Sequence, residues 1–552
     1  MYARLAAGKG AGGAPVKYLQ LAENRWDPAK KRSVARIVYS FGRADQVDVD
    51  AVRRLAASLT RAVGDEPASG GEVIPPDESR PAGGAWVLDH LWRRLGLDRA
   101  VASSRAAGPG RPRDLAAMER ALFAMVANRA LAPSSKLACA EWANNGQAVP
   151  GLAEAAGEID EDDCYRAMDW LSDHQDAFGR AVFDSVADLL NLEVDLVFFD
   201  TTSTYWEADW ADESGFRTWG NSKDHRGDLP QIVIGMAVTR DGVPVRVWCW
   251  PGNSGDQELI RQAREEMREW SLSRVVWCAD RGFASSKNRR ELMRGGDGYI
   301  LGEKLRSGSP EVRAALGRAG RYQLVAGNLQ VKEVRVEEAQ DRMIVCFNPE
   351  QVPRDKAARA RMVAILEDLI DGSDRLAPAK RAELKGKISA RPGPNRFLRT
   401  TPKGLLRVDR AKIAAEARLD GKYLLRTSNP NLAAEDVALG CKQLLQVERG
   451  WRDMKSVLDL RPVYHHLEHR IRAHVILCWL ALLLARVAEN TVGDTWRNIR
   501  REMQRLARTT YTTPAGAAIA HTRTTPIQAD ILAKLRIPAP PRIIRAEPAP
   551  SP

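Results

Sequence analysis

The residues Leu196–Ser203, which read LVFFDTTS, decide how the central part of this chain folds. Their apolar run has the pattern of a buried strand, and it ends in the carboxylate of Asp200. A second stretch, Arg274–Phe283 (RVVWCADRGF), repeats the arrangement with an apolar run, then Asp280, then a turn-forming glycine. Because α/β sheets bind their ligands at the carboxyl ends of strands, both aspartates stand where a site is expected.

The runs around these two stretches predict an α/β region that begins with an antiparallel meander. The further strands are expected at Ile232–Val238, Val243–Trp250 and Tyr299–Leu301, with a helix at Asp256–Trp270. Counted from residue 194, Asp200 closes the first strand and Asp280 the fourth. In a ribonuclease-H-like sheet these two strands are parallel neighbours, so both carboxylates would project at one edge and offer Mg²⁺ the hard oxygen ligands it prefers.

A third stretch, Val447–Ser456 (VERGWRDMKS), has the spacing of one helical face. Glu448, Trp451, Arg452 and Lys455 stand at positions i, i+3, i+4 and i+7. A glutamate aimed at the two aspartates would complete a two-metal site, and the neighbouring cations would hold backbone phosphates.

Each stretch also has an ordinary explanation when it is taken alone. Most aspartates at strand ends cap the turn or helix that follows, and most charged helix faces are simply solvated. The presence of all three stretches in one chain favours the site.

Together the three stretches resemble the DDE transposases of bacterial insertion sequences, specifically the "insertion sequence four" superfamily. The resemblance rests on FFDTT at 198–202, ADRGF at 279–283, and Glu448 followed after six residues by Lys455. Similar stretches are SKDHR at 222–226, PGN at 251–253 and RPVYH at 461–465, so the resemblance spans most of residues 16–490. The chain departs from the family motif at Cys441 and Leu444, where a tyrosine and an arginine are expected.

The resemblance implies a DNA transposase that cleaves transposon ends and joins them to target DNA. Two Mg²⁺ (or Mn²⁺) ions held by Asp200, Asp280 and Glu448 would activate water and then the 3′ hydroxyl of the transposon. The implied partners are the terminal inverted repeats, target DNA and a second copy of the chain in the DNA complex. The residues expected to bind DNA are Lys455, Arg452, Arg449, Trp451 and Arg281.

The segments expected along the chain follow from changes in composition and periodicity. Residues 66–84 are rich in Gly and Pro, and residues from 85 onward have helical spacing. We expect a small basic β unit at 1–65, a linker at 66–84, a helical DNA-binding domain at 85–192, the ribonuclease-H-like core at 193–302 and 436–490, a β-rich insertion at 303–435 outside the core sheet, and a basic helix with a Pro-rich tail at 491–552.

The overall composition is compatible with this interpretation. The 552 residues carry 83 Lys and Arg against 71 Asp and Glu, a formal charge of +12 that suits a polyanionic partner. Seven scattered cysteines without a CxxC pair argue against a disulfide framework or a zinc site and favour the reducing cytoplasm. The resemblance to bacterial insertion-sequence transposases implies a place near the bacterial nucleoid. The longest apolar run, Val475–Ala485, is too short for a membrane span and predicts a buried helix.

Two other functions remain open from the sequence. A haloacid-dehalogenase-like phosphatase also begins with a strand that ends in Asp, but it needs a second Asp two residues later, where this chain has Thr202. A catalytically silent DNA-binding protein derived from a transposase would keep the fold, although the intact Asp200, Asp280 and Glu448 argue against such decay.

Overall fold

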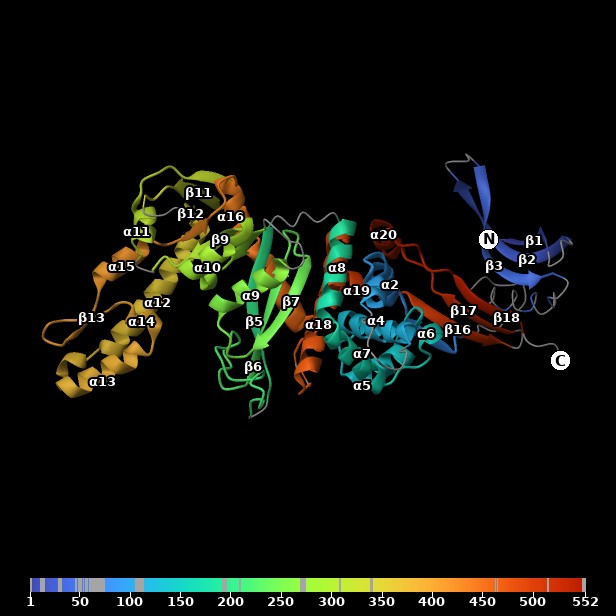
Figure 1. The fold of residues 1–552 in the computed structure, drawn as a ribbon, viewed down its shortest axis with the longest axis horizontal. Coiled ribbons are helices and arrows are strands. Elements are labelled where there is room, and N and C mark those ends of the chain that lie inside the picture. The colour runs from blue at the N-terminus through green and yellow to red at the C-terminus, as the bar shows by residue number, and fades with distance from the viewer. Residues whose placement is uncertain are drawn as a thin grey trace. The chain divides into compact units, whose positions relative to one another are not determined.

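The computed structural model describes residues 2–9, 15–27, 32–44, 47, 52, 54, 58, 75–104, 114–190, 196–207, 210–268, 275–306, 309–337, 341–461, 463, 465–513 and 516–548. The chain folds into two compact units. We call Glu193–Trp451 the central unit, and Met1–Leu192 with Arg452–Pro552 the terminal unit. Each is described by itself (Figure 1).

A nine-stranded mixed sheet with the order β10-β11-β12-β15-β9-β8-β5-β6-β7 forms the central unit. Its strands are β5 (Leu196–Tyr205), β6 (Gln231–Val238), β7 (Pro244–Pro251), β8 (Val276–Ala279), β9 (Gly298–Glu303), β10 (Gln323–Ala326), β11 (Leu329–Val334), β12 (Arg342–Phe347) and β15 (Lys422–Thr427). Strands β5, β8 and β9 are parallel, and the other neighbours are antiparallel. The meander of β5, β6 and β7 and the parallel pair of β5 and β8 agree with the sequence prediction.

Strand β5 is longer than its apolar run predicted, so Asp200 does not close it. Strand β6 pairs with β5 from Phe198 to Tyr205, whereas β8 pairs with it only as far as Phe199. The pairing with β6 therefore keeps the polar residues after Asp200 in the extended conformation of a strand. Asp200 lies at the point where its neighbour β8 ends.

Some helices of the central unit pack around this sheet, and others form a separate cluster. They are α9 (Asp256–Arg268), α10 (Ser286–Leu292), α11 (Pro310–Gly317), α12 (Val352–Ile370), α13 (Pro378–Ser389), α14 (Pro392–Asn395), α15 (Arg410–Ala417), α16 (Ala434–Lys442) and α17 (Leu444–Ser456), the last of which continues past Trp451. Short 3₁₀ turns are η2 (Arg281–Phe283), η3 (Arg294–Gly296), η4 (Pro349–Gln351) and η5 (Ser373–Arg375). A hairpin of β13 (Leu398–Thr400) and β14 (Leu406–Val408) completes the cluster around α12.

The region 303–435 differs from the expected β-rich insertion outside the sheet. Its strands β10, β11, β12 and β15 extend the central sheet, because β15 pairs antiparallel with β9 and so covers what would be an open edge. The rest is mainly helical: α12 to α15 enclose a small core of their own and stand apart from β5 and β6 in Figure 1. That core consists of Leu366, Ile388, Phe397, Leu398 and Leu406.

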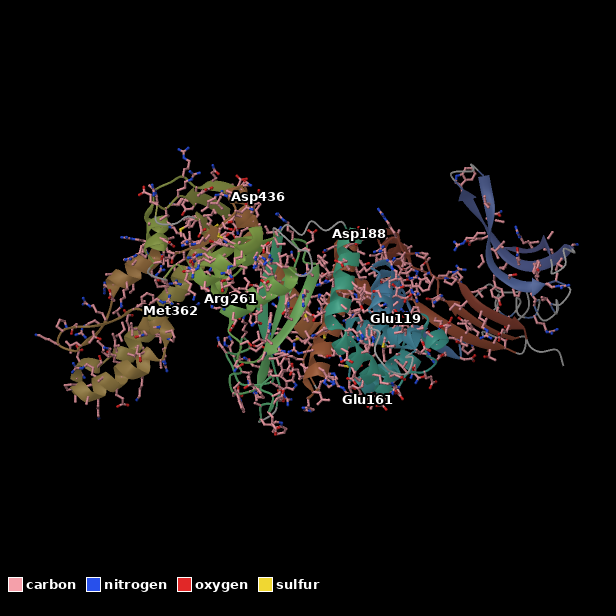
Figure 2. All side chains as sticks on the ribbon, viewed as in Figure 1. Glu119, Glu161, Asp188, Arg261, Met362 and Asp436 are labelled. Carbon is pink, nitrogen blue, oxygen red and sulfur yellow. The ribbon has the colours of Figure 1, made fainter. Side chains whose placement is uncertain are left out.

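The terminal unit is built on helices, as expected for the range 85–192. They are α2 (Gly83–Arg94), α3 (Leu97–Ser103), α4 (Leu115–Leu131), α5 (Lys136–Glu141), the π-helix η1 (Trp142–Gly146), α6 (Leu152–Ala155), α7 (Glu161–Asp173), α8 (Gln175–Leu190), α18 (Glu468–Val492), α19 (Trp496–Met503) and α20 (Pro526–Lys534). On α4, Glu119 (Figure 2) accepts a 2.6 Å hydrogen bond from the buried indole of Trp92.

Helix α18 is the core of this unit, and not part of the sheet unit to which the range 436–490 assigned it. It packs against α4 and α7, and it is apolar on all sides because neighbours surround it. Among the described residues, α18 is the one helix whose length and mean hydropathy of 1.8 would allow a membrane crossing, but 89% of that apolar window is buried inside the protein. It therefore has the environment of a core helix.

Two antiparallel sheets contain the chain ends, and the second of them differs from the expected segments. Strands β1 (Tyr2–Lys9), β2 (Pro15–Asp27) and β3 (Arg32–Arg43) form one sheet, and β18 (Ile543–Pro548), β17 (Gly516–His521), β16 (Ala507–Thr513) and β4 (Glu78–Pro81) form the other. The predicted linker therefore contributes β4, and the predicted tail contributes β18. The predicted basic helix ends at Met503 because the Thr-rich segment after it favours a strand.

Candidate active site

The register of β5 and β8 brings Asp200 and Asp280 together. The last parallel pair is Phe199 with Ala279, and each aspartate directly follows one residue of this pair. Because neighbouring strands lie about 4.8 Å apart, the two backbones are adjacent at this point. The charge of Asp280 also acts on Asp200 and contributes to raising its pKa. We call this place the acidic edge.

Asp200 is held in surroundings that disfavour its charge. Burial raises the pKa of its carboxyl to about 6, and the negative charges of Asp256 and Asp280 act in the same direction. The ammonium of Lys223 and the backbone N–H of Thr201 oppose the rise. Its side chain is 26% exposed, so the carboxylate can still be reached from solvent. Strained electrostatics of this kind cluster at functional sites.

The capping explanation accounts for neither aspartate. Asp200 lies inside a strand, so no helix begins there. Asp280 precedes the 3₁₀ turn η2, but only its backbone carbonyl takes part, accepting a 3.0 Å hydrogen bond from Phe283 N. Its exposed carboxylate caps none of the backbone N–H groups of that turn. Both side chains are therefore available at the edge.

Two site residues that the sequence reasoning did not select lie beside Asp200. Lys223 Nζ stands 3.9 Å from Asp200 Oδ1 and 3.3 Å from Asp256 Oδ2. Asp256 Oδ1 in turn accepts a 2.6 Å hydrogen bond from Thr201 Oγ1. The signal for Lys223 was present in the SKDHR stretch, whereas Asp256 opens α9, where an acidic residue is usually explained by the helix itself.

The first turn of α9 forms hydrogen bonds both to β5 and to the turn η2 that follows β8. Asp256 is bound to Thr201 of β5, and the next residue, Gln257, donates to the carbonyl of Gly282 in η2. Asn288 of α10 supports that turn by donating to Gln257 Oε1 at 3.2 Å and to the carbonyl of Phe283 at 3.0 Å. The acidic edge is therefore built on a rigid frame of hydrogen bonds.

Glu448 lies on α17 as predicted, but it is not gathered with the two aspartates. In the described part of the chain, no three side chains of His, Cys, Asp or Glu are placed to hold one metal ion. Helix α17 instead meets the β6–β7 turn, where a Cβ on Gly242 would stand 3.0 Å from Gln446 Oε1. Glu448 itself is exposed. A third carboxylate would add to the repulsion already present at Asp200.

The predicted DNA-binding residues fall into different environments. Arg281 and Arg452 are exposed, and Arg449 and Lys455 are half-buried. Trp451 is only 6% exposed, so its ring serves as packing and cannot stack on a base as it stands. Exposed indoles are found instead at Trp210 and Trp219 (62% and 47% exposed), in the connection between β5 and β6, and at Trp26 (63%) on β2 of the terminal unit.

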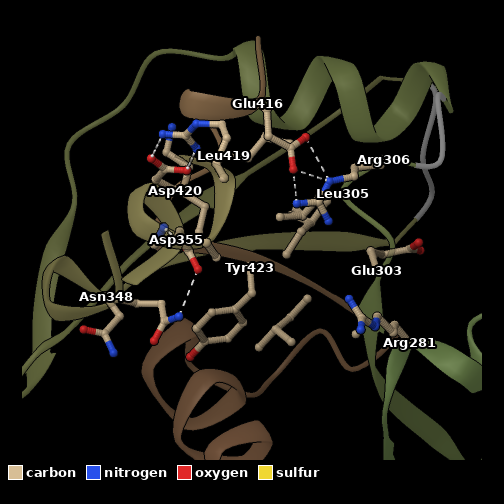
Figure 3. Close-up of a pocket in the computed structure, with 18 of the residues that line it drawn as sticks. Arg281, Glu303, Leu305, Arg306, Asn348, Asp355, Glu416, Leu419, Asp420 and Tyr423 are labelled. Atoms are coloured by element: carbon tan, nitrogen blue, oxygen red, sulfur yellow. Dashed lines mark hydrogen bonds and ion pairs between the residues drawn. The ribbon is translucent and has the colours of Figure 1, made fainter. Parts of the chain in front are cut away.

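A polar cavity of about 500 Å³ opens beside the acidic edge (Figure 3). Asp280 and Arg281 belong to its wall together with residues of α12, α15 and β15. The cations on the far wall are paired: Arg306 Nε donates to Glu416 Oε1 at 2.7 Å, and Arg359 Nη2 donates to Asp420 Oδ2 at 2.7 Å. Arg281 has no such acidic partner within the described residues, so its charge is available to a ligand.

The side chains at the acidic edge have the chemistry of a divalent-cation site. Carboxylate oxygens are hard ligands of the kind that Mg²⁺ and Mn²⁺ bind. The ammonium of Lys223 already lies within 4 Å of two of these carboxylates, which shows that the edge attracts a cation. Asp200 and Asp280 therefore fit a metal ion, with the set of ligands still incomplete.

Comparisons with known proteins found a family match and a similar solved structure. Residues 194–484, more than half of the chain, match the family described as "Transposase DDE domain". Among solved structures, the chain is similar to the piggyBac transposase in its synaptic complex with hairpin DNA, at 9% identity, 76% coverage of each chain and a TM-score of 0.33. No relative was found among curated proteins.

Proposed function

The chain belongs to the transposase DDE domain family, and from this premise we propose that it cleaves transposon ends and joins them to target DNA by two-metal phosphoryl transfer. The family match confirms the predicted resemblance to DDE transposases. The observation that carries the proposal is the adjacent placement of Asp200 and Asp280 on parallel strands inside the matched region. We place the chain, further, in the bacterial "insertion sequence four" superfamily with a ribonuclease-H-like core.

In this proposal Asp200, Asp280 and Glu448 hold two Mg²⁺ or Mn²⁺ ions. When bound, the ions would lower the pKa of an attacking water or 3′ hydroxyl and stabilise the charge that develops on the phosphate. Asp200 and Asp280 are already paired by the sheet. Glu448 has to approach them from α17, and neutralisation of the edge by cations removes the repulsion that opposes this movement.

Cationic residues near the edge would position the DNA backbone. Arg281 follows Asp280 directly and is exposed, which suits a contact to the phosphate that reacts. Lys455, Arg452 and Arg449 follow Glu448 on α17 and would bind phosphates farther along the strand. We assign stacking on an unpaired base to the exposed Trp210 or Trp219 in place of the buried Trp451.

Strand cleavage of DNA that carries the terminal inverted repeats tests the proposal. Asp200→Asn, Asp280→Asn and Glu448→Gln should each lower Mg²⁺-dependent cleavage by about 10³-fold or more while DNA binding persists, because each removes a charged oxygen ligand. Matched controls are Asp436→Asn and Glu435→Gln, exposed acids on α16 that should keep normal cleavage (Figure 2 shows Asp436).

The outcome also separates the alternatives. A wild-type chain that binds the repeats but never cleaves them would be the catalytically silent DNA-binding protein. Hydrolysis of small phosphate esters without any action on DNA would favour the phosphatase, which the family match does not support. Near-normal cleavage by Glu448→Gln would remove Glu448 from the site while leaving the two aspartates in it.

A further inference from the structure

Lys223 places a positive charge at the centre of the acidic edge. Its Nζ donates to the backbone carbonyl of Thr201 at 2.8 Å and stands 3.3 Å from Asp256 Oδ2 and 3.9 Å from Asp200 Oδ1. Among the described residues, no other Lys or Arg nitrogen lies within 4 Å of either carboxylate. A single ammonium therefore neutralises the part of the edge nearest to Asp200.

Thr201 and Asp256 together fix the position of that ammonium, which donates to the hydroxyl of Thr201 as well as to its carbonyl and forms an ion pair with Asp256. One oxygen of Asp256 is engaged by Thr201 Oγ1 at 2.6 Å, which leaves the other oxygen facing Lys223. The side chains of Lys223 and Asp256 are each 35% exposed, so the lysine has room to move toward solvent. The contacts that hold the ammonium are thus hydrogen bonds and ion pairs, which can exchange with solvent.

The charges at the edge are not balanced by this lysine. The charges of Asp256 and Asp280 both act on Asp200, and one ammonium faces Asp200 and Asp256. A cation that approaches Asp200 meets an attractive cluster of carboxylates and, in the same place, the repulsion of Lys223. Coulomb interactions at such distances are strong compared with those between fully solvated charges.

We propose that Lys223 is a built-in countercharge that competes with the divalent cation for Asp200, and that Asp256 is the positioning residue that holds it there. This inference rests on the proposed function, because it assumes that Asp200 and Asp280 bind the metal. Lys223 would keep the edge stable without metal and would weaken metal binding until the complete ligand set has assembled. The pair would then set the affinity of the site for its ions.

The test is Mn²⁺ binding to the full-length chain without DNA, measured from the electron paramagnetic resonance signal of free Mn²⁺. Lys223→Met removes the charge and keeps the length of the side chain, so Mn²⁺ should bind about tenfold more tightly. Lys223→Gln, which keeps a donor for the carbonyl of Thr201, should tighten binding similarly. Lys223→Arg keeps the charge and should bind as the wild type does.

A matched control removes the same charge elsewhere in the central unit. Lys287 is an exposed lysine on α10, and Lys287→Met should change the Mn²⁺ affinity by less than twofold. Thermal melting checks that each variant is folded. If Lys223→Met does not fold, Lys223→Gln is used in its place. Unchanged or weaker Mn²⁺ binding by folded Lys223→Gln would overturn the inference, because it would make Lys223 a structural support only.

The role of Asp256 is tested by the same substitution in the wild-type chain and in the Lys223→Met variant. In the wild type, Asp256→Asn should weaken Mn²⁺ binding severalfold, because Lys223 then faces Asp200 alone. In the Lys223→Met background the same change should have little effect. An equal loss in the two backgrounds would overturn the positioning role and make Asp256 a direct ligand.

The failure of this inference can be told apart from failure of the proposed function. If Mn²⁺ binding in the wild type is insensitive to both Asp200→Asn and Asp280→Asn, the proposed metal site is wrong. If Mn²⁺ binding depends on those two aspartates but Lys223→Met and Lys223→Gln have the Mn²⁺ affinity of the wild type, the proposed metal site is supported and the countercharge role of Lys223 is wrong.

Discussion

Two charged clusters in this molecule have similar residues and opposite electrostatic character. In the terminal unit, Arg486 of α18 is 2% exposed and forms ion pairs with Asp453, at 2.5 Å, and with Glu489. In the central unit, Asp200 lies beside Asp256 and Asp280 with one lysine shared between them. In the first cluster both acids contact the arginine directly, whereas in the second the lysine lies within 4 Å of only two of the three carboxylates.

The two clusters differ in whether their charged groups are paired with one another: those around Arg486 are, and those around Asp200 are paired only in part. A buried arginine with two acids at hydrogen-bond distance stabilises the packing of the elements that carry it. Carboxylates that are held together by a frame of hydrogen bonds, and that repel one another, lower stability unless a cation binds. The acidic edge is therefore the place where the fold carries an unfavourable charge.

Replacement of Arg486 should have the largest effect on stability. Arg486→Met removes the arginine that pairs with Asp453 and Glu489, and breaking a buried ion pair in this way costs about 3–5 kcal/mol. The free energy of unfolding from urea denaturation measures the effect. A loss below about 1 kcal/mol would mean that this cluster does not hold the terminal unit together.

Removal of a charge from the acidic edge should have the opposite sign. Asp200→Asn should raise the stability of the metal-free protein by on the order of 1–2 kcal/mol, because the pKa of about 6 shows that the charged carboxylate is disfavoured there. The same variant should lose DNA cleavage. Thermal melting with and without Mn²⁺ checks the prediction, and a destabilised Asp200→Asn would contradict the view of the edge as strained.

The two units should also respond to acid in opposite directions. The folded pKa of Asp200 is raised, so protonation from about pH 6 toward pH 4 favours the folded central unit. In the terminal unit, burial, with Lys136 and Arg129 nearby, lowers the pKa of His465 to about 3, and burial also lowers the pKa of His474. The unfolded state there takes up protons first, so stability falls as the pH drops below about 6.5.

Hydrogen exchange, corrected for intrinsic rates, can follow both units in one sample. Protection of β5 should rise and protection of α18 should fall between pH 6.8 and pH 5. Loss of protection in both segments to the same extent would show that the acidic edge carries no excess charge at neutral pH.

The smallest expected effect concerns the exposed cation at the edge. Arg281→Gln should weaken DNA binding without changing cleavage-site preference, and it should reduce the slope of log affinity against log salt by about 1, the value for one lost phosphate contact. Fluorescence anisotropy with labelled repeat DNA at several salt concentrations measures the slope. An unchanged slope would place Arg281 away from the DNA backbone.

Much of the site follows from local sequence patterns. The apolar runs before Asp200 and Asp280 and the helical spacing around Glu448 predicted β5, β8 and α17, because burial periodicity is a property of neighbouring residues. The parallel pairing of β5 and β8 was also expected from the order of strands, and the register agrees with it. The seven cysteines are free, in agreement with the absence of any paired spacing.

Other features depend on contacts between distant segments, which local periodicity does not encode. The apolar pattern of α18 predicted a buried helix but not that α4 and α7 would bury it, since any apolar surface would have served. The sequence predicted a β-rich insertion at 303–435, and only the open edge of β9, covered by β15, decided that its strands would extend the central sheet. The contact of Lys223 with Asp256 likewise arises where the β5–β6 connection meets the first turn of α9, because hydrogen bonds between residues far apart in the chain form only after the sheet has assembled.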